Sequence, residues 1–88
     1  MCSYITEQVA VEGSAKGPTG WMAVDRATIY YDHPYHAPFD HSLNIDFVNA
    51  ADGAPTRVAL ELSAASARAL VQSILAALAQ GEQAHAGA

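Results

Sequence analysis

The chain has little of three things: cysteine, positive charge and continuous apolar sequence. Its single cysteine, Cys2, excludes an internal disulfide and fits a reducing compartment. Four basic residues stand against nine acidic ones, for a net charge of −5, which leaves no basic surface for nucleic acid or an anionic membrane. No apolar run approaches the roughly 20 residues that span a bilayer, and the first residues lack the basic and apolar segments of a signal peptide. We therefore expect a cytoplasmic protein that binds neither nucleic acid nor membrane.

The length of 88 residues corresponds to one small domain. A chain of this size hides roughly 60–65% of its unfolded surface, so its core is marginal unless a metal or a partner subunit adds to it. The apolar fraction of 51% is nevertheless enough for a folded protein. We expect residues 1–80 to form a single domain and residues 81–88 to form a flexible tail.

Alternation of apolar and polar residues, with many β-branched and aromatic side chains, predicts strands. Four segments show it: residues 3–12, 21–32, 43–48 and 57–62. Short connections favour antiparallel pairing of strands that follow one another, and the Asp52-Gly53 pair is typical of a turn. The sequence therefore predicts a four-stranded antiparallel meander.

A C-terminal helix follows from the next segment. Ser63 is a favourable N-cap, and Gly81 is a typical residue for a helix end. Between them, five large apolar residues recur at helical spacing and form a stripe about 100° wide. They are Leu70, Val71, Ile74, Leu75 and Leu78. The complete expectation is an α+β fold in which this helix packs on one face of the sheet.

The alternation also predicts the strand register. Pairing each strand with the next around its connection brings apolar residues together on one side of the sheet. The expected pairs are Ile29 with Ile45, Tyr31 with Leu43, Ile45 with Leu60, and Phe47 with Val58. A slip of one residue would turn a whole strand inside out, so this agreement favours the register.

The first strand is ambiguous, because two sets of its residues could face inward. One set is Ser3, Ile5, Val9 and Val11, and the other is Cys2, Tyr4, Thr6 and Ala10. Asp25 in the second strand would also point inward under strict alternation. A β-bulge near Asp25 would resolve both points.

One end of this sheet gathers the reactive side chains. His33 and His41 should face each other across the connection between the second and third strands. Folding the first strand back along the second brings Cys2 within about one strand spacing, ~4.8 Å, of His33. The N-terminus of the helix, with its partial positive charge, opens at the same end, near His36 and Asp40.

A transition-metal site is the first functional hypothesis. A thiolate and several imidazoles are ligands that zinc or copper accepts, so the candidate ligands are Cys2, His33, His36 and His41. Pro34 and Pro38 would stiffen the loop, and Asp32 or Asp40 could orient an imidazole. The bound metal could then activate water or a small polar substrate.

Two further hypotheses remain open. In the first, the loop histidines only form hydrogen bonds with backbone groups, and the chain is an accessory or interaction protein without metal. It would form a homodimer that buries the second face of the sheet. Alternatively, Cys2 could act as a nucleophile with a histidine as base and an aspartate as orienting group. The glycine-rich segment 13–20 lacks the Gly-Lys-Ser/Thr sequence of a phosphate-binding loop and precedes a strand. We expect a flexible hairpin loop there and no nucleotide cofactor.

Three stretches of the chain, MCSYITEQVAVEGSAKGPTGW, IYYDHPYHAPFDHSLNIDF and RVALELSAASARALV, resemble a family of short uncharacterised bacterial proteins. Its members begin Met-Cys-x-Tyr-Ile and carry a Tyr-Tyr-Asp-His-Pro-x-His stretch. The resemblance covers nearly the whole sequence and implies a complete small protein. The family has no established activity, so the resemblance assigns no role to any residue.

Overall fold

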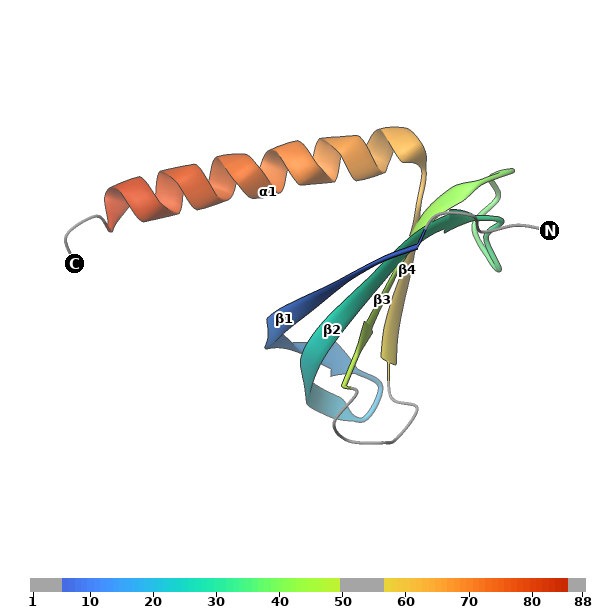
Figure 1. The fold of residues 1–88 in the computed structure, drawn as a ribbon, viewed down its shortest axis with the longest axis horizontal. Helices are drawn as coiled ribbons and strands as arrows, with labels where there is room; N and C mark the ends of the chain where they lie inside the picture. Colours follow the sequence, from blue (N-terminus) through green and yellow to red (C-terminus); the bar gives the residue numbers. More distant parts are fainter. Residues whose placement is uncertain (1–5, 50–56, 86–88) are drawn as a thin grey trace.

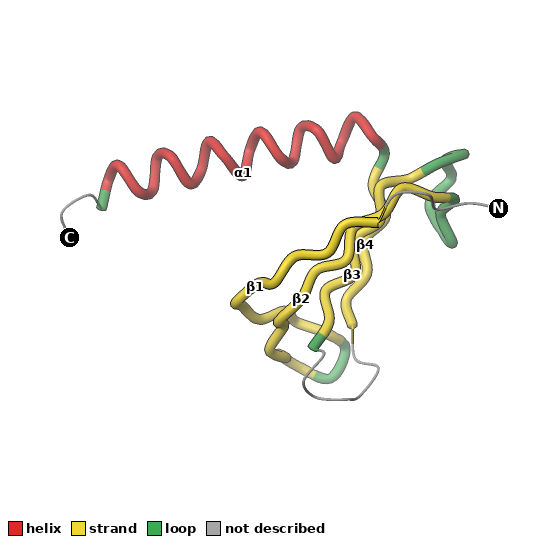
Figure 2. The backbone as a smooth tube through the Cα atoms, viewed as in Figure 1, coloured by secondary structure: helices red, strands yellow, loops and turns green. Residues whose placement is uncertain are grey.

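The computed structural model describes residues 6–49 and 57–85. Within them, one open antiparallel sheet in the order β1-β2-β3-β4 is followed by one helix (Figure 1 and Figure 2). The elements are β1 (Thr6–Gly17), β2 (Gly20–Asp32), β3 (Ser42–Val48), β4 (Arg57–Leu62) and α1 (Ala64–Ala84). The predicted α+β fold and the meander are confirmed. The predicted Asp52-Gly53 turn and Cys2 lie outside the described residues.

All four predicted strand pairs are present. Ile45 on β3 pairs with Ile29 on β2 and with Leu60 on β4, and Tyr31–Leu43 and Phe47–Val58 also pair. Residues directly opposite each other point to the same side of a sheet. We call this side the apolar face; it carries Val9, Ala27, Ile29, Tyr31, Leu43, Ile45, Phe47, Val58, Leu60 and Leu62.

The hairpin between β1 and β2 is tighter than the sequence predicts. Residues 13–20 were expected to form a loop, but β1 continues to Gly17 and β2 begins at Gly20, so only Pro18 and Thr19 form the turn. The expectation was wrong because the residues between the glycines pair regularly with β2, as in Lys16 with Trp21. Gly20 has a φ of +126°, a conformation that side-chain-bearing residues rarely adopt.

The predicted irregularity near Asp25 is present. The register between β1 and β2 shifts between Ala10 and Gly13, opposite Asp25. Val9 pairs with Ala27 on the apolar face, which agrees with the set of inward residues that includes Val9. The bulge adds one residue to β1 after Ala10, and the strand bends there.

Both ends of α1 are capped by side chains. The Ser63 hydroxyl accepts a hydrogen bond from the backbone N–H of Ser66 at 3.1 Å, so the predicted N-cap is confirmed. The predicted end at Gly81 is wrong, because the helix continues to Ala84. His85 closes it: its backbone nitrogen and its Nδ1 atom lie 3.1 Å and 2.9 Å from the Gly81 carbonyl oxygen. Glu82 to Ala84 favour helix, and this outweighs one glycine.

The expected packing of the helix on one face of the sheet is not present in the single chain, where α1 runs away from the sheet (Figure 1). No residue of α1 is buried, its contacts with the sheet are mainly with β3, and its five large apolar side chains are 40% to 56% exposed. Only Ser63 separates Leu62 at the end of β4 from Ala64 at the start of α1. This one-residue connection joins the direction of the helix to that of β4.

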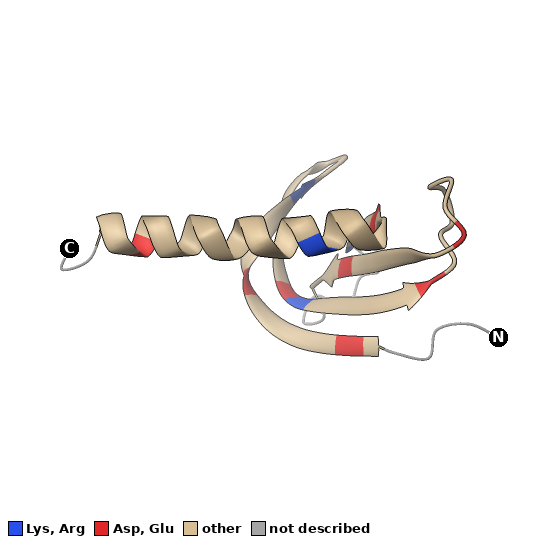
Figure 3. Ribbon diagram, turned by 90° about the horizontal axis from the view of Figure 1, so that it is seen from above, with Lys and Arg blue, Asp and Glu red and all other residues tan. Residues whose placement is uncertain are grey.

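The buried core of the described residues is small. Its apolar members are Val24 and Ala27, 7% and 3% exposed, both on β2. Charged residues are spread over the strands, whereas α1 carries Arg68 near its start and Glu82 near its end (Figure 3). In the part of the chain that the structure describes, no helix has the length and hydropathy to cross a bilayer. Most large apolar side chains of the described residues are therefore partly or largely exposed.

Candidate functional site

The histidine loop, residues 33–41, is held against the sheet by Glu61 of β4. The Glu61 carboxylate accepts hydrogen bonds from three consecutive backbone N–H groups of the loop. The nitrogen–oxygen distances are 2.5 Å from Tyr35, 3.0 Å from His36 and 2.8 Å from Ala37. Two proline residues, Pro34 and Pro38, flank this triplet in the sequence. The loop is therefore anchored through its backbone, which leaves its side chains available for other contacts.

The hydrogen bonds have an electrostatic consequence for Glu61. Donation from the Ala37 and Tyr35 backbones, with a smaller contribution from His36, holds the pKa of the carboxyl below its ordinary value of 4.5. Partial loss of hydration acts in the opposite direction but is the weaker influence. Glu61 is consequently a carboxylate at neutral pH, and this anion holds the loop by accepting its backbone hydrogen bonds.

The two ends of the histidine loop meet at the apolar side of the sheet. The rings of His33 and His41 are stacked, with centroids 4.7 Å apart and planes at 29°. His41 also stacks on Tyr31, with centroids 5.7 Å apart and planes at 11°. The prediction that His33 and His41 face each other is confirmed, and the structure adds an aromatic neighbour to the pair.

The tautomer of the His33 ring follows from its contact with Asp40. Its Nδ1 atom lies 2.9 Å from the Asp40 carbonyl oxygen, and a carbonyl oxygen can only accept a hydrogen bond. Nδ1 therefore carries the proton, and in the neutral ring Nε2 keeps its lone pair. The backbone nitrogen of His33 donates to the Asp32 carboxylate at 2.7 Å, which fixes the start of the loop.

The four predicted metal ligands are not gathered into one described cluster. Within residues 6–49 and 57–85, no group of three or more His, Cys, Asp or Glu side chains could hold a metal ion. His33 and His41 are side by side, while the backbone of His36 is bound to Glu61. Cys2 lies outside the described residues, so its predicted contact with His33 stays a prediction.

A shallow hollow lies on the polar side of the sheet, between the loop and β4. Tyr35, His36, Ala37, Arg57, Ala59 and Glu61 line it. At its margin, Arg57 of β4 forms an ion pair with Asp46 of the neighbouring β3 at 3.1 Å. Burial, followed by the nearby Asp46 carboxylate, raises the pKa of Tyr30 above 10.0. The polar side of the sheet therefore carries the histidine loop, the ion-paired Arg57 and the protonated Tyr30.

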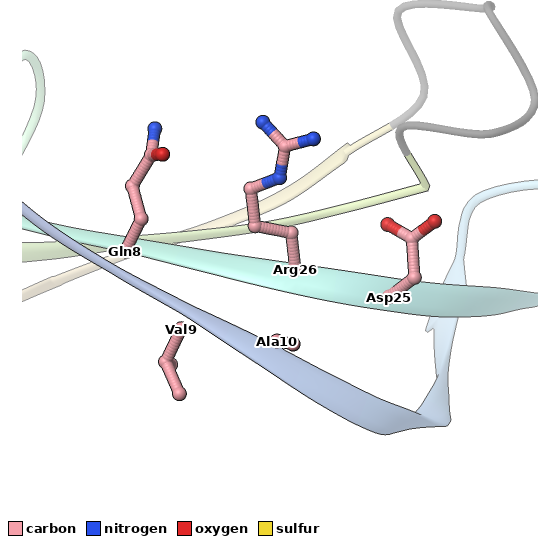
Figure 4. A pocket seen from close by; sticks show the side chains of 5 residues that line it. All are labelled: Gln8, Val9, Ala10, Asp25 and Arg26. Atoms are coloured by element: carbon pink, nitrogen blue, oxygen red, sulfur yellow. The ribbon is translucent and has the colours of Figure 1, made fainter.

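A second hollow lies at the bulge between β1 and β2. It is lined by Gln8, Val9, Ala10, Asp25 and Arg26. Figure 4 shows Gln8, Asp25 and Arg26 on one side of the strands and Val9 on the other. Asp25 and Arg26, consecutive on β2, point to the same side beside the bulge, whose extra residue lies on β1. This hollow is a consequence of the bend, and its side chains do not converge on one point.

Sequence reasoning missed the role of Glu61. The sequence indicates only that Glu61 and Asp46 share the solvent face with Arg57, as a cross-strand charge pair. The donors that Glu61 binds lie 24 to 26 positions earlier in the chain, so no local pattern indicates them. The buried hydrogen bond between the Ser42 hydroxyl and the Asn44 side-chain oxygen, 2.7 Å, was also unforeseen.

These features define a small α+β protein with one curved antiparallel sheet, an anchored histidine loop and an uncovered apolar helix. The chain matches the family of unknown function DUF6295 over residues 1–87 and belongs to that family. No curated protein and no solved structure matches it.

Proposed function

We propose that this protein is an interaction module that binds another polypeptide through α1. The observation that carries the proposal is the exposure of the helix: five large apolar side chains lie on one side of it, and none of its residues is buried. A contiguous apolar surface of this kind is rare on proteins that work alone and usually marks a binding surface.

The composition of α1 supports the same function. Alanine is frequent along the helix, which favours helix formation without tertiary packing. No charged residue occurs between Arg68 and Glu82, so burial of the stripe would not remove a charge from water. An amphipathic helix that is already formed can enter an apolar groove or cover an apolar surface with little further ordering.

Amide hydrogen exchange of the dilute protein tests this function. In a chain whose helix has no intramolecular cover, amides of α1 should exchange much faster than those of β2 and β3, because only local helix–coil opening protects them. If α1 is as protected as the central strands while sedimentation shows a monomer, the helix packs on its own sheet. The proposed function would then be wrong.

Transition-metal binding is a second candidate, and the contact between His33 and Asp40 favours it. A histidine that binds a metal commonly donates its other ring N–H to a carbonyl or carboxylate, which fixes the tautomer. His33 makes this contact through Nδ1, and the ring of His41 lies 4.7 Å away. We infer that Nε2 of each ring could ligate zinc or copper, with Cys2 and His36 as further candidate ligands. A site completed by a thiolate would bind more tightly than two imidazoles alone.

A further inference from the structure

We propose that a second copy of this chain covers the apolar stripe of α1, in a symmetric homodimer in which each helix lies on the apolar face of the partner's sheet. This inference rests on the proposed function, since it names the polypeptide that α1 binds. Unlike the proposed function, it requires that the purified chain binds itself, with no other protein present.

The chain carries two apolar surfaces that do not meet within it. One is the stripe on α1, and the other is the apolar face of the sheet. On that face Val9, Tyr31 and Leu60 are 38% to 50% exposed, and Ile29, Ile45 and Phe47 are only half-buried. A homodimer with two-fold symmetry would bury both surfaces of both chains, because the helix of each chain would then cover the sheet of the other.

The size of the two surfaces is compatible. From Leu70 to Leu78 a helix rises about 12 Å, at about 1.5 Å per residue. Four strands at a spacing of about 4.8 Å span about 14 Å between the outer two. The stripe is therefore about as long as the sheet is wide, so one helix that crosses the strands would cover all of them.

The accessible area of the chain exceeds that of a compact monomer of the same mass. It amounts to 6630 Å², whereas a compact monomer of 9.2 kDa is expected to expose about 4,900 Å². The excess of about 1,700 Å² per chain lies within the range that obligate homodimers bury, about 1,000–2,500 Å² on each subunit. The radius of gyration of 15.0 Å, against about 12 Å for a compact domain of this length, shows the same excess.

The charge distribution permits two copies to associate despite the net charge of −5 on each. The stripe has no charged residue between Arg68 and Glu82. On the apolar face, the acidic residue opposite Ile29 is Glu7, which lies on the edge strand β1. Asp46 and Glu61 lie on the polar side of the sheet, away from the proposed contact, and repulsion between such exposed charges is screened by salt.

Sedimentation and hydrogen exchange of the untagged full chain test the proposal over a range of concentrations. We expect a dimer at micromolar concentration, with protection of α1 that disappears on dilution. Ile74→Glu places a charge within the stripe and should raise the dimer dissociation constant at least about 100-fold. Gln72→Glu adds the same charge on the opposite side of the helix and should leave it nearly unchanged.

Cross-linking identifies the surface that α1 covers. On a Cys2→Ser background, one protein carries Leu60→Cys and another carries Leu75→Cys. A short bis-maleimide added to the mixture should give a covalent heterodimer in high yield. If no cross-link joins the two proteins, or if cross-links form only between two Leu75→Cys chains, the helix-on-partner-sheet arrangement is wrong.

The outcomes separate this inference from the proposed function. A chain that stays monomeric, with α1 unprotected at every concentration, would overturn the homodimer while the helix remained an uncovered binding surface. A monomer with α1 protected at every concentration would overturn both. Protection of α1 that follows dimer formation, and is lost in Ile74→Glu but kept in Gln72→Glu, supports both.

Discussion

The carboxylate of Glu61 lies 2.5 Å from the backbone nitrogen of Tyr35, and this contact joins the end of β4 to a loop 26 residues earlier in the chain. The same carboxylate binds the next two backbone nitrogens. One side chain therefore anchors the loop that carries three of the four histidines.

Acidification should release the histidine loop. The pKa of Glu61 is lowered in the folded state, so its stabilising effect is complete above its ordinary value of 4.5 and is lost as the pH falls through the lower folded value. The amide resonances of Tyr35, His36 and Ala37 should move together below about pH 4.5, toward positions typical of an unbound loop. An NMR titration from pH 7 to pH 2.5 measures this.

The matched variants for this titration are Glu61→Gln and Glu82→Gln. Glu61→Gln removes the charge and should shift the three amide resonances already at pH 7, while the amides of β2 and β3 stay in place. Glu82→Gln removes a charge from α1 and should leave the loop unaffected. Unchanged loop amides in Glu61→Gln would contradict the anchoring role.

Alanine at two glycine positions should have opposite effects. Gly20→Ala forces a side chain into a φ of +126° and should destabilise the sheet by about 1–3 kcal/mol. Gly81→Ala lies inside α1 with open space around it and should stabilise the helix by about 0.5–1 kcal/mol. Urea unfolding detects the first effect. The second should appear as slower hydrogen exchange within α1.

Metal binding, if it occurs at the histidine loop, should depend on His33 and His41. Calorimetric titration of untagged protein with Zn²⁺ or Cu²⁺ should show near-stoichiometric binding that the double variant His33→Ala, His41→Ala abolishes. His85→Ala removes an imidazole from the end of α1 and serves as the control. Equal binding by both variants, or none by the natural sequence, would exclude this site.

The thiol of Cys2 offers a separate test of the nucleophile hypothesis. A catalytic thiol beside an imidazole and a helix N-terminus should be ionised at neutral pH and react with iodoacetamide faster than free cysteine. His33→Ala should then slow the reaction. A rate equal to that of free cysteine, with no effect of His33→Ala, would remove the support for this role.

The strand pattern of this protein can be predicted from its sequence. Ile29, Ile45 and Leu60 pair across three strands as alternation predicts, because only this register keeps the apolar side chains on one side. The meeting of His33 and His41 follows from the same register. Local chemistry also predicted the cap at Ser63, whose hydroxyl reaches a donor only three residues away.

The amino-acid order alone therefore determined the elements, their register and the positions where they start, since these depend on neighbours close in sequence or directly across a strand. Tertiary structure decided the rest. The partner of Glu61 depends on where a loop 24 to 26 residues away folds back, and the direction of α1 depends on the single extended residue, Ser63, that joins it to β4. Periodicity shows that a helix has an apolar side, but it cannot show whether that side meets its own sheet or another chain, because both bury the same residues.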